Sequence, residues 1–273
     1  MKSFNEISDL VDVRIREYFT GPKEEGDISN ILAYALECGK RIRPALLLMT
    51  YEMLKGEITE KAISFSLAME FIHNYSLIHD DLPAMDNDEY RRGRFTVHSK
   101  YGEDLAILAG DSLLNEAFEL MSANVENEND IKAMRVIGNY SGRKGMIKGQ
   151  VLDLANKQDS IDKIIETYEY KTSRLLMASA MAGAYLAGAD NHTIDKIKEF
   201  AVNLGLAYQI KDDLFDCEED EKITKNTALK YISKDEAQEY VENYTNSAVR
   251  AIENIEDSAS ILTLARKLVE RKS

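Results

Sequence analysis

The chain has 273 residues and a formal net charge of −14, with 48 acidic against 34 basic side chains. This balance argues against a nucleic-acid partner, because the chain offers no basic stripe that could neutralise phosphates. Apolar residues make up 44% of the sequence, enough for a substantial core, and the only cysteines are Cys38 and Cys217. Two cysteines give no disulfide framework, so we expect a reducing, cytoplasmic location.

Helical periodicity dominates the chain, and we find no convincing alternating pattern that would predict a strand. A first segment carries Leu10, Val13 and Tyr18 roughly on one stripe. The later predicted helices cover residues 28–37, 41–54, 59–81, 103–124, 129–156, 160–188, 192–218 and 234–270. No uncharged run reaches the ~20 residues that span a bilayer, so we expect no transmembrane segment. The sequence therefore predicts one all-α domain over residues 1–273, built as a large helical bundle.

The predicted helix over residues 59–81 ends in a cluster of carboxylates. Asp80 and Asp81 lie at its C-terminal end, because Pro83 disfavours helical geometry in the residue before it. Carboxylates are unfavourable at that end of a helix dipole, and they repel one another unless a cation neutralises them. A break at Pro83 would let Asp86 fold back towards the pair.

A second cluster, formed by Asp212, Asp213 and Asp216, closes the predicted helix over residues 192–218. Asp212 and Asp216 are four residues apart and stack on one helix face. Magnesium bound by a few carboxylates usually shares its remaining positions with water and substrate phosphate. Acidic proteins also place such runs on solvated surfaces by chance, but both clusters here end long apolar segments. The two clusters therefore predict a magnesium site, with manganese as the alternative, that grips a diphosphate.

Basic side chains accompany the clusters. Arg91 and Arg92 follow the first cluster, and arginine suits bidentate capture of phosphate oxygens. Lys40 and Arg43 form a second candidate phosphate site, although a positively charged loop before a helix would look the same. His73 lies two turns, or roughly 10 Å, before the first cluster on the same helix face. A lone helical histidine is more often structural, so its role depends on its neighbours.

Together these residues resemble the trans-polyprenyl diphosphate synthase family, and closely its bacterial short-chain members, the farnesyl and geranylgeranyl diphosphate synthases. The matching strings are GKRIRP at 39–44, EFIHNYSLIHDDLPAMDND at 70–88, RRG at 91–93, LAGDSLL at 108–114, GQVLDL at 149–154, YKT at 170–172 and GLAYQIKDDLFD at 205–216. They run in family order over most of the chain. The resemblance implies the isoprenoid synthase fold, an all-α bundle around a deep central cavity, usually in a homodimer. It also implies a prenyltransferase that condenses isopentenyl diphosphate with an allylic diphosphate, dimethylallyl or geranyl diphosphate.

The resemblance assigns roles to individual positions. The residues matching the two metal-binding motifs are Asp80, Asp81, Asp86, Asp212, Asp213 and Asp216. Those matching positions that hold the allylic diphosphate or face its developing cation are Arg91, Lys171, Thr172 and Gln209. Those matching the isopentenyl diphosphate site are Lys40, Arg43, His73 and Arg92.

One segment departs from the family pattern. After the second aspartate motif the family usually has a longer loop with two Gly-Lys pairs and a Ser/Thr-Tyr-Pro sequence. This chain has only residues 217–229, with both glycines absent and Ala228-Leu229 where Tyr-Pro is expected. Lys225 is the better match to the second loop lysine, and Lys222 is a candidate for the first. The departure places active-site closure, or the substrate contact made there, in question.

Two residues before the first cluster predict product length. Tyr75 and Ser76 precede Asp80 by five and four residues, where side chains of the family form the floor of the elongation cavity. A bulky aromatic at the fifth position resembles the farnesyl-producing bacterial type. Tyr75 could equally be a core aromatic, since a helical wheel puts it about 140° from Asp80. We therefore expect farnesyl diphosphate as the product, with geranylgeranyl diphosphate as the alternative.

Two other functions remain open at this point. A class I terpene cyclase also ionises a prenyl diphosphate, but it normally carries a different second metal motif, rich in Asn, Ser/Thr and Glu. A non-catalytic partner subunit of a prenyl synthase typically loses an aspartate motif, whereas this chain keeps both. Only the altered loop over residues 217–229 favours the partner subunit.

Overall fold

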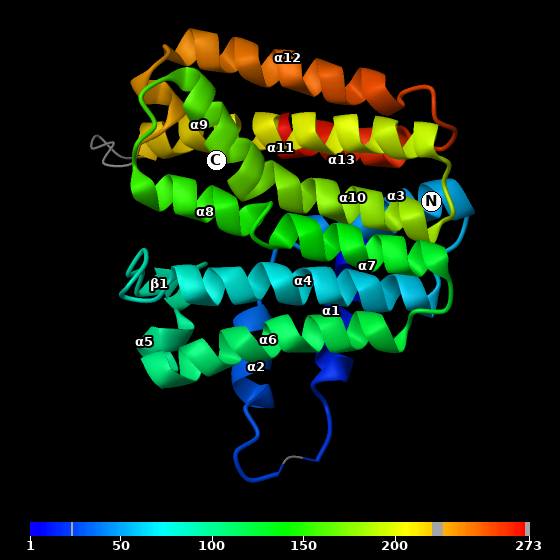
Figure 1. Ribbon diagram of the computed structural model, residues 1–273, viewed down its shortest axis with the longest axis vertical. Coiled ribbons are helices and arrows are strands. Elements are labelled where there is room, and N and C mark those ends of the chain that lie inside the picture. Colours follow the sequence, from blue (N-terminus) through cyan, green and yellow to red (C-terminus); the bar gives the residue numbers. More distant parts are fainter. Residues whose placement is uncertain (23, 220–225, 271–273) are drawn as a thin grey trace.

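The computed structural model describes residues 1–22, 24–219 and 226–270, and of residues 216–219 it describes the backbone alone. The all-α prediction is confirmed (Figure 1). In chain order the helices are α1 (Phe4–Tyr18), α2 (Ser29–Leu36), α3 (Ile42–Lys55), α4 (Glu60–Asp80), α5 (Val97–Tyr101), α6 (Glu103–Ala123), α7 (Glu128–Ser141), α8 (Met146–Ala155), α9 (Ile161–Tyr168), α10 (Arg174–Leu186), α11 (Asn191–Glu219), α12 (Lys234–Ile252) and α13 (Ala259–Glu270). A π-helical turn, η1 (Glu169–Ser173), joins α9 to α10, and a 3₁₀ turn, η2 (Ala228–Lys230), precedes α12.

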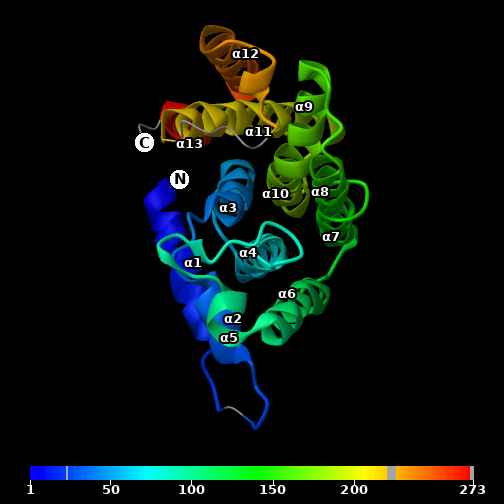
Figure 2. The same cartoon turned by 90° about the vertical axis from the view of Figure 1, so that its left-hand side faces the viewer.

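The core lies around α3, α4 and α10, which run through the interior while the other helices surround them (Figure 2). These three helices are apolar on most of their circumference, as expected of buried helices. Gly183 of α10 allows close packing on α3, because a Cβ atom there would lie 2.3 Å from the carbonyl oxygen of Leu47. No helix in the described ranges is long and apolar enough to cross a membrane.

Two predicted helices are each divided, so their predicted continuity was wrong. The segment 129–156 breaks between α7 and α8, where Gly142 and Gly145 lie; a Cβ atom at Gly145 would lie 2.0 Å from the carbonyl oxygen of Tyr140. The predicted helix over residues 160–188 is continuous from residue 161 to residue 186, but it includes the π-helical turn η1. The segment 234–270 breaks between α12 and α13, near Asp257 with its left-handed φ of 59°.

A short hairpin corrects the expectation that the chain has no strands. Strands β1 (Tyr90–Arg91) and β2 (Arg94–Phe95) pair antiparallel directly after the first aspartate cluster. Arg92 and Gly93 form the turn with φ angles of 53° and 73°. Positive φ at both central residues is the requirement of a type I′ two-residue hairpin. The strands are too short for an alternating pattern to reveal them.

Candidate active site

The chain folds back at the end of α4 and gathers the first aspartate cluster. The helix ends at Asp80, one residue before its predicted end, and the amide of Asp86 donates to the carbonyl oxygen of Asp80 at 2.8 Å. The amide of Asp88 donates to the carbonyl oxygen of Asp81 at 3.2 Å. The predicted return of Asp86 after Pro83 is therefore confirmed for the backbone.

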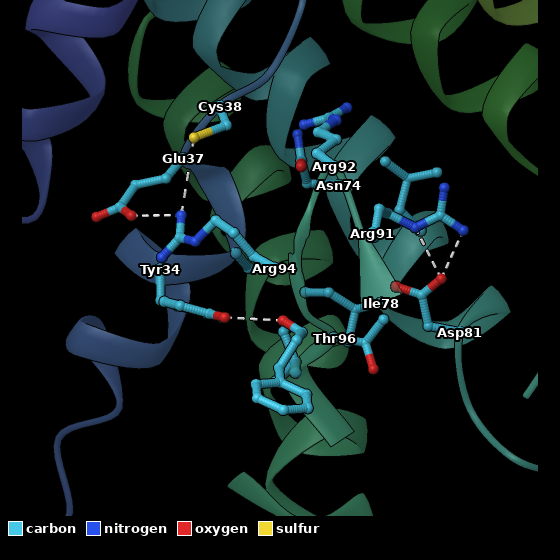
Figure 3. A pocket seen from close by; sticks show the side chains of 14 residues that line it. Tyr34, Glu37, Cys38, Asn74, Ile78, Asp81, Arg91, Arg92, Arg94 and Thr96 are labelled. Carbon is cyan, nitrogen blue, oxygen red and sulfur yellow. Dashed lines mark hydrogen bonds and ion pairs between the residues drawn. The ribbon is translucent and has the colours of Figure 1, made fainter. Parts of the chain in front are cut away.

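The carboxylates of this cluster lie in an environment that disfavours their charge. Burial raises the pKa of Asp80 to about 6, and the neighbouring Asp86 adds to that rise while Lys171 opposes it. Burial also raises the pKa of Asp81, although Arg91 opposes the rise. The Arg91 Nε and Nη2 atoms lie 2.7 and 2.5 Å from Asp81 Oδ1 (Figure 3). A predicted metal ligand and a predicted diphosphate ligand thus contact each other directly.

The oxygen-only donor set of the cluster fits a magnesium ion. Among the side chains that the structure describes, no three His, Cys, Asp or Glu residues converge closely enough to hold a metal ion by themselves. Asp80 is nevertheless a desolvated carboxylate beside other carboxylates, and a bound cation would relieve that cost. Hard carboxylate oxygens with remaining positions for water and phosphate are the ligands that magnesium favours. The side chain of Asp216 lies outside the described residues.

The predicted isopentenyl diphosphate residues come from three segments. Arg43 of α3 and His73 of α4 are in contact, with 3.1 Å between Arg43 Nη1 and His73 Nε2. Burial, followed by the charge of Arg43, lowers the pKa of His73 well below its usual range, so His73 is neutral and accepts this hydrogen bond. Arg92 stands exposed at the hairpin turn and Lys40 stands exposed in the turn before α3. Lys225 lies outside the described residues.

The η1 turn presents Lys171 and Thr172. Lys171 Nζ donates to Asp153 Oδ2 at 2.5 Å, and the Thr172 hydroxyl donates to Gln209 Oε1 of α11 at 2.7 Å. Two glycines allow neighbouring helices to pack closely against this turn. A Cβ atom at Gly149 of α8 would lie 2.2 Å from the backbone nitrogen of Lys171, and one at Gly205 of α11 would lie 2.6 Å from the Cα atom of Ser173. π-helical turns inside α-helices often occur at functional sites.

A cavity of about 420 Å³ joins several of these groups. Its lining residues are Arg43, His73, Tyr75, Ser76, Leu77, His79, Asp80, Met85, Met146, Ile147, Gln150, Val151, Leu154, Lys171 and Thr172. Charged groups from α3, α4 and η1 thus share one space with apolar side chains from α4 and α8. The predicted product-length residues Tyr75 and Ser76 lie in its wall, and Tyr75 is only 7% exposed.

A second, smaller pocket of about 50 Å³ lies beside the hairpin (Figure 3). Asp81, Arg91 and Arg92 line it together with Cys38 and Arg94. The first aspartate cluster therefore borders both the cavity, through Asp80, and the pocket, through Asp81. The cavity has apolar walls, whereas the lining of the small pocket includes three arginines, Arg91, Arg92 and Arg94.

Two residues of the site were missed by sequence reasoning. Asp153 pairs with Lys171, and it stands in the matched string GQVLDL, four residues after Gly149 and thus on the same face of α8 that packs against η1. Tyr168 donates to Asp213 Oδ2 at 2.5 Å. Nothing in the sequence near Tyr168 distinguishes it from a core aromatic, so no signal could have found it.

Known proteins share both the sequence and the fold. A family model described as "Polyprenyl synthetase" matches residues 25–255, which include both aspartate clusters. The chain is 40% identical over 230 residues to a farnesyl diphosphate synthase of Geobacillus stearothermophilus, covering 81% of this chain and 77% of that one. It is 35% identical over 269 residues to a chloroplastic geranylgeranyl pyrophosphate synthase of Capsicum annuum, covering 91% and 73%. The crystal structure of an FPP/GFPP synthase from Zymomonas mobilis matches with a TM-score of 0.88 at 31% identity, covering 97% and 99%.

Proposed function

The chain belongs to the polyprenyl synthetase family and is a short-chain prenyltransferase, and we propose that its main product is farnesyl diphosphate. Its substrates are then isopentenyl diphosphate and an allylic diphosphate, dimethylallyl or geranyl diphosphate. The observation that carries this proposal is the cavity with charged groups and apolar walls, in which Asp80 and Lys171 face the same space as Tyr75, Met146 and Val151. A diphosphate fits the charged part, and a hydrocarbon tail fits the apolar part.

The charged residues divide between the two substrates. Arg91 and Lys171 bind the allylic diphosphate, whose α- and β-phosphates lie near Asp80 in this arrangement. Arg43 and Arg92, with Lys40, bind the diphosphate of isopentenyl diphosphate. Neutral His73 orients the Arg43 guanidinium through their 3.1 Å contact. Guanidinium groups suit this task because they bind phosphate oxygens in a bidentate way.

The reaction begins with cleavage of the bond between C1 and the oxygen of the allylic diphosphate. Bound magnesium, held by aspartates of both clusters, would supply positive charge that stabilises the leaving diphosphate. The hydroxyl oxygen of Thr172 and the amide oxygen of Gln209 direct their dipoles at the allylic carbocation. The double bond of isopentenyl diphosphate then attacks C1, and the released diphosphate takes the proton that is lost. The apolar walls exclude the water that would quench the cation.

We further propose that the protein acts as a homodimer in the cytoplasm. Helices α6, α7 and α8 line one side of the molecule (Figure 2), and α6 and α8 each carry large exposed apolar side chains. Leu108 of α6 is 54% exposed, and Val151 and Leu154 of α8 are 61% and 53% exposed. Large contiguous apolar surface on a protein commonly marks an interface. A second copy of the chain would cover it.

The decisive experiment is a turnover assay with labelled isopentenyl diphosphate and defined allylic primers. Dimethylallyl, geranyl and farnesyl diphosphate are each supplied with magnesium, and the products are resolved by chain length. We expect fifteen-carbon product from the first two primers and little or no extension of farnesyl diphosphate. Products that are mainly of twenty carbons would overturn the farnesyl assignment. A cyclic hydrocarbon formed without isopentenyl diphosphate would overturn prenyl transfer as the main activity.

A further inference from the structure

Asp213 has a set of partners unlike that of an exposed metal ligand. Its side chain is only 5% exposed. Its Oδ2 atom accepts a hydrogen bond from the Tyr168 hydroxyl at 2.5 Å and another from the backbone amide of Ala228 at 3.1 Å. The same Ala228 amide lies 3.0 Å from the Tyr168 oxygen, so the three groups form a closed triangle. Ala228 itself is fully buried over them.

The path of the chain explains how Ala228 reaches Asp213. Asp213 lies six residues before the end of α11 at Glu219, which is roughly 9 Å along the helix axis. Ala228 nevertheless contacts Asp213, so residues 226–231 (the returning segment) lie against the last turns of that helix and not beyond its end. The η2 turn inside this segment begins at Ala228. The Asp213 carboxylate is covered by the protein's own backbone.

A second group of hydrogen bonds holds the returning segment against the junction of α8 and α9. Asn226 Nδ2 lies 3.1 Å from both the carbonyl oxygen and the Oε1 atom of Gln158. The Tyr231 hydroxyl donates to the same carbonyl oxygen at 2.6 Å. Gln158 in turn donates to the carbonyl oxygen of Leu152 at 2.7 Å. The segment is thus fixed at two places, and only one of them involves α11.

The Tyr168–Asp213 contact is also one of two hydrogen bonds that align the chain around the η1 turn with helix α11. Tyr168 pairs with Asp213 and Thr172 pairs with Gln209, so the partners are four residues apart on each side and run in opposite directions. Residues four apart share a helix face. The pair therefore sets how the η1 turn, with Lys171, lies relative to the end of α11. Asp212, the residue before Asp213 in that helix, projects about 100° away from it around the helix axis.

We infer that Asp213 is the anchor of the returning segment and not a metal ligand, and that Tyr168 is a positioning residue for the η1 turn. Asp212 is then the metal ligand that we assign to the described side chains of the second cluster. The positioning role of Tyr168 rests on the proposed prenyl transfer, whereas the anchoring role of Asp213 does not.

The first experiment separates an anchor from a metal ligand. Asp213→Asn keeps a carbonyl oxygen that can accept both hydrogen bonds but loses the negative charge that a metal ligand needs. We measure Mn²⁺ binding by electron paramagnetic resonance in the presence of inorganic pyrophosphate. Asp213→Asn should bind Mn²⁺ within about threefold of the parent, and Asp212→Asn should bind at least about tenfold more weakly, as loss of a metal contact does. Equal weakening in both variants would overturn the inference.

The second experiment needs no activity and tests the anchor directly. Hydrogen exchange is followed at the Ala228 amide in the full chain. Asp213→Ala should accelerate exchange there by about tenfold or more, because the amide loses its acceptor, while exchange in α4 stays unchanged. Asp212→Ala is the matched control and should leave Ala228 unchanged. Unchanged exchange at Ala228 in Asp213→Ala contradicts the anchor. If Asp213→Ala does not fold, the Mn²⁺ comparison with Asp213→Asn still decides.

The third experiment tests the positioning role of Tyr168. Tyr168→Phe removes one hydroxyl that touches Asp213, and Tyr231→Phe removes one hydroxyl that holds the same returning segment elsewhere. We expect Tyr168→Phe to lower kcat about tenfold with both KM values within about twofold, because Tyr168 sets the register of Thr172 and Gln209, whose dipoles act on the cation in the transition state. Tyr231→Phe should keep kcat within about twofold of the parent. Equal losses of kcat would mean that Tyr168 only holds the segment. Absence of any turnover in the parent would refute the proposed function and leave the exchange result standing.

Discussion

The Thr172 hydroxyl donates a hydrogen bond of 2.7 Å to Oε1 of Gln209 and so joins the π-helical turn to α11. Because the hydroxyl hydrogen points at Gln209, the lone pairs of the Thr172 oxygen remain available to face another group. The amide oxygen of Gln209 is held in place at the same time. Two oxygen dipoles are thereby oriented without any charged residue, which suits a short-lived cation better than a nucleophilic carboxylate would.

Removing this hydrogen bond should slow the reaction without removing substrate binding. Thr172→Val has nearly the same volume but no hydroxyl, and we expect kcat to fall roughly tenfold or more, as loss of one oriented dipole does. Thr172→Ser keeps the hydroxyl and is the matched control, with kcat within a few-fold of the parent. Steady-state kinetics with both substrates measure this. A Thr172→Val enzyme with the parent's kcat would contradict the role of the pair.

Asp80 should be essential for turnover and dispensable for stability. Burial raises its pKa to about 6, so the folded protein bears a cost for this carboxylate in the absence of a cation. Asp80→Asn should lower kcat by about three orders of magnitude or more, as loss of metal assistance implies. Its urea midpoint should equal or exceed that of the parent. Full activity of the parent in excess chelator would remove the basis of this prediction.

The neighbouring arginines should affect different substrates. Arg92 stands at the hairpin turn, whereas Arg91 contacts Asp81 of the first cluster. Arg92→Ala should raise the KM for isopentenyl diphosphate by about tenfold or more and change the allylic KM less, since one charge-assisted phosphate contact is lost. Arg91→Ala should do the opposite. Initial rates with each substrate varied in turn decide between them, and a reversed pattern would exchange the two assignments.

Product length should depend on the ring of Tyr75. This ring lies in the cavity wall, 7% exposed, and packs edge-on against His79 with 5.9 Å between ring centroids. Tyr75→Ala should let the growing chain pass and shift the product from fifteen towards twenty carbons. Tyr75→Phe keeps the ring and should keep the product. Chromatography of the dephosphorylated alcohols measures the distribution, and an unchanged distribution in Tyr75→Ala would assign the length limit to other residues.

Acid should destabilise the protein through His73. Its pKa is lowered in the folded state by burial and by the charges of Arg43, Arg92, Arg91 and Arg41, in that order. The unfolded chain therefore binds a proton near pH 6.5 that the folded protein does not bind. The free energy of unfolding is unaffected by His73 well above pH 6.5, and it decreases as the pH falls below that value.

The measurement is urea unfolding of the parent and of His73→Gln between pH 7.5 and 5.5. We expect the free energy of unfolding of the parent to fall relative to the variant by about 1 kcal/mol over this range. If the difference between the unfolding free energies of the parent and the variant stays constant with pH, His73 is protonated equally in the folded and unfolded states.

The long helices and the fold-back at Pro83 could be predicted because their causes are local. Apolar periodicity marks a buried helix, and proline restricts the residue before it. The return of Asp86 to the Asp80 carbonyl follows from these two rules. The hairpin could not be predicted, because Arg92-Gly93 is not one of the Asn-Gly, Asp-Gly or Gly-Gly pairs that signal a two-residue turn. Its strands were also too short to show an alternating pattern.

The contacts between distant segments could not be predicted in the same way. The pairing of Lys171 with Asp153, and of Tyr168 with Asp213, depends on how α8, η1 and α11 pack in three dimensions. The interruption at η1 is likewise a consequence of packing, since Gly149 and Gly205 lie against it from two sides. That the buried ring of Tyr75 also borders the cavity could be learned only from the structure.

Gly149 brings the backbone of α8 against the backbone of Lys171, and the same helix carries Met146, Val151 and Leu154 into the cavity wall. The position of α8 therefore determines both the width of the hydrocarbon passage and the placement of Lys171. An outward shift of α8 that makes room for a longer tail also pulls at the turn that holds Lys171. Trimming side chains on α4 makes room without moving any backbone. Substitutions that change product size in descendants of this enzyme should accordingly be found mainly on α4. Substitutions in α8 that change product size should also slow turnover.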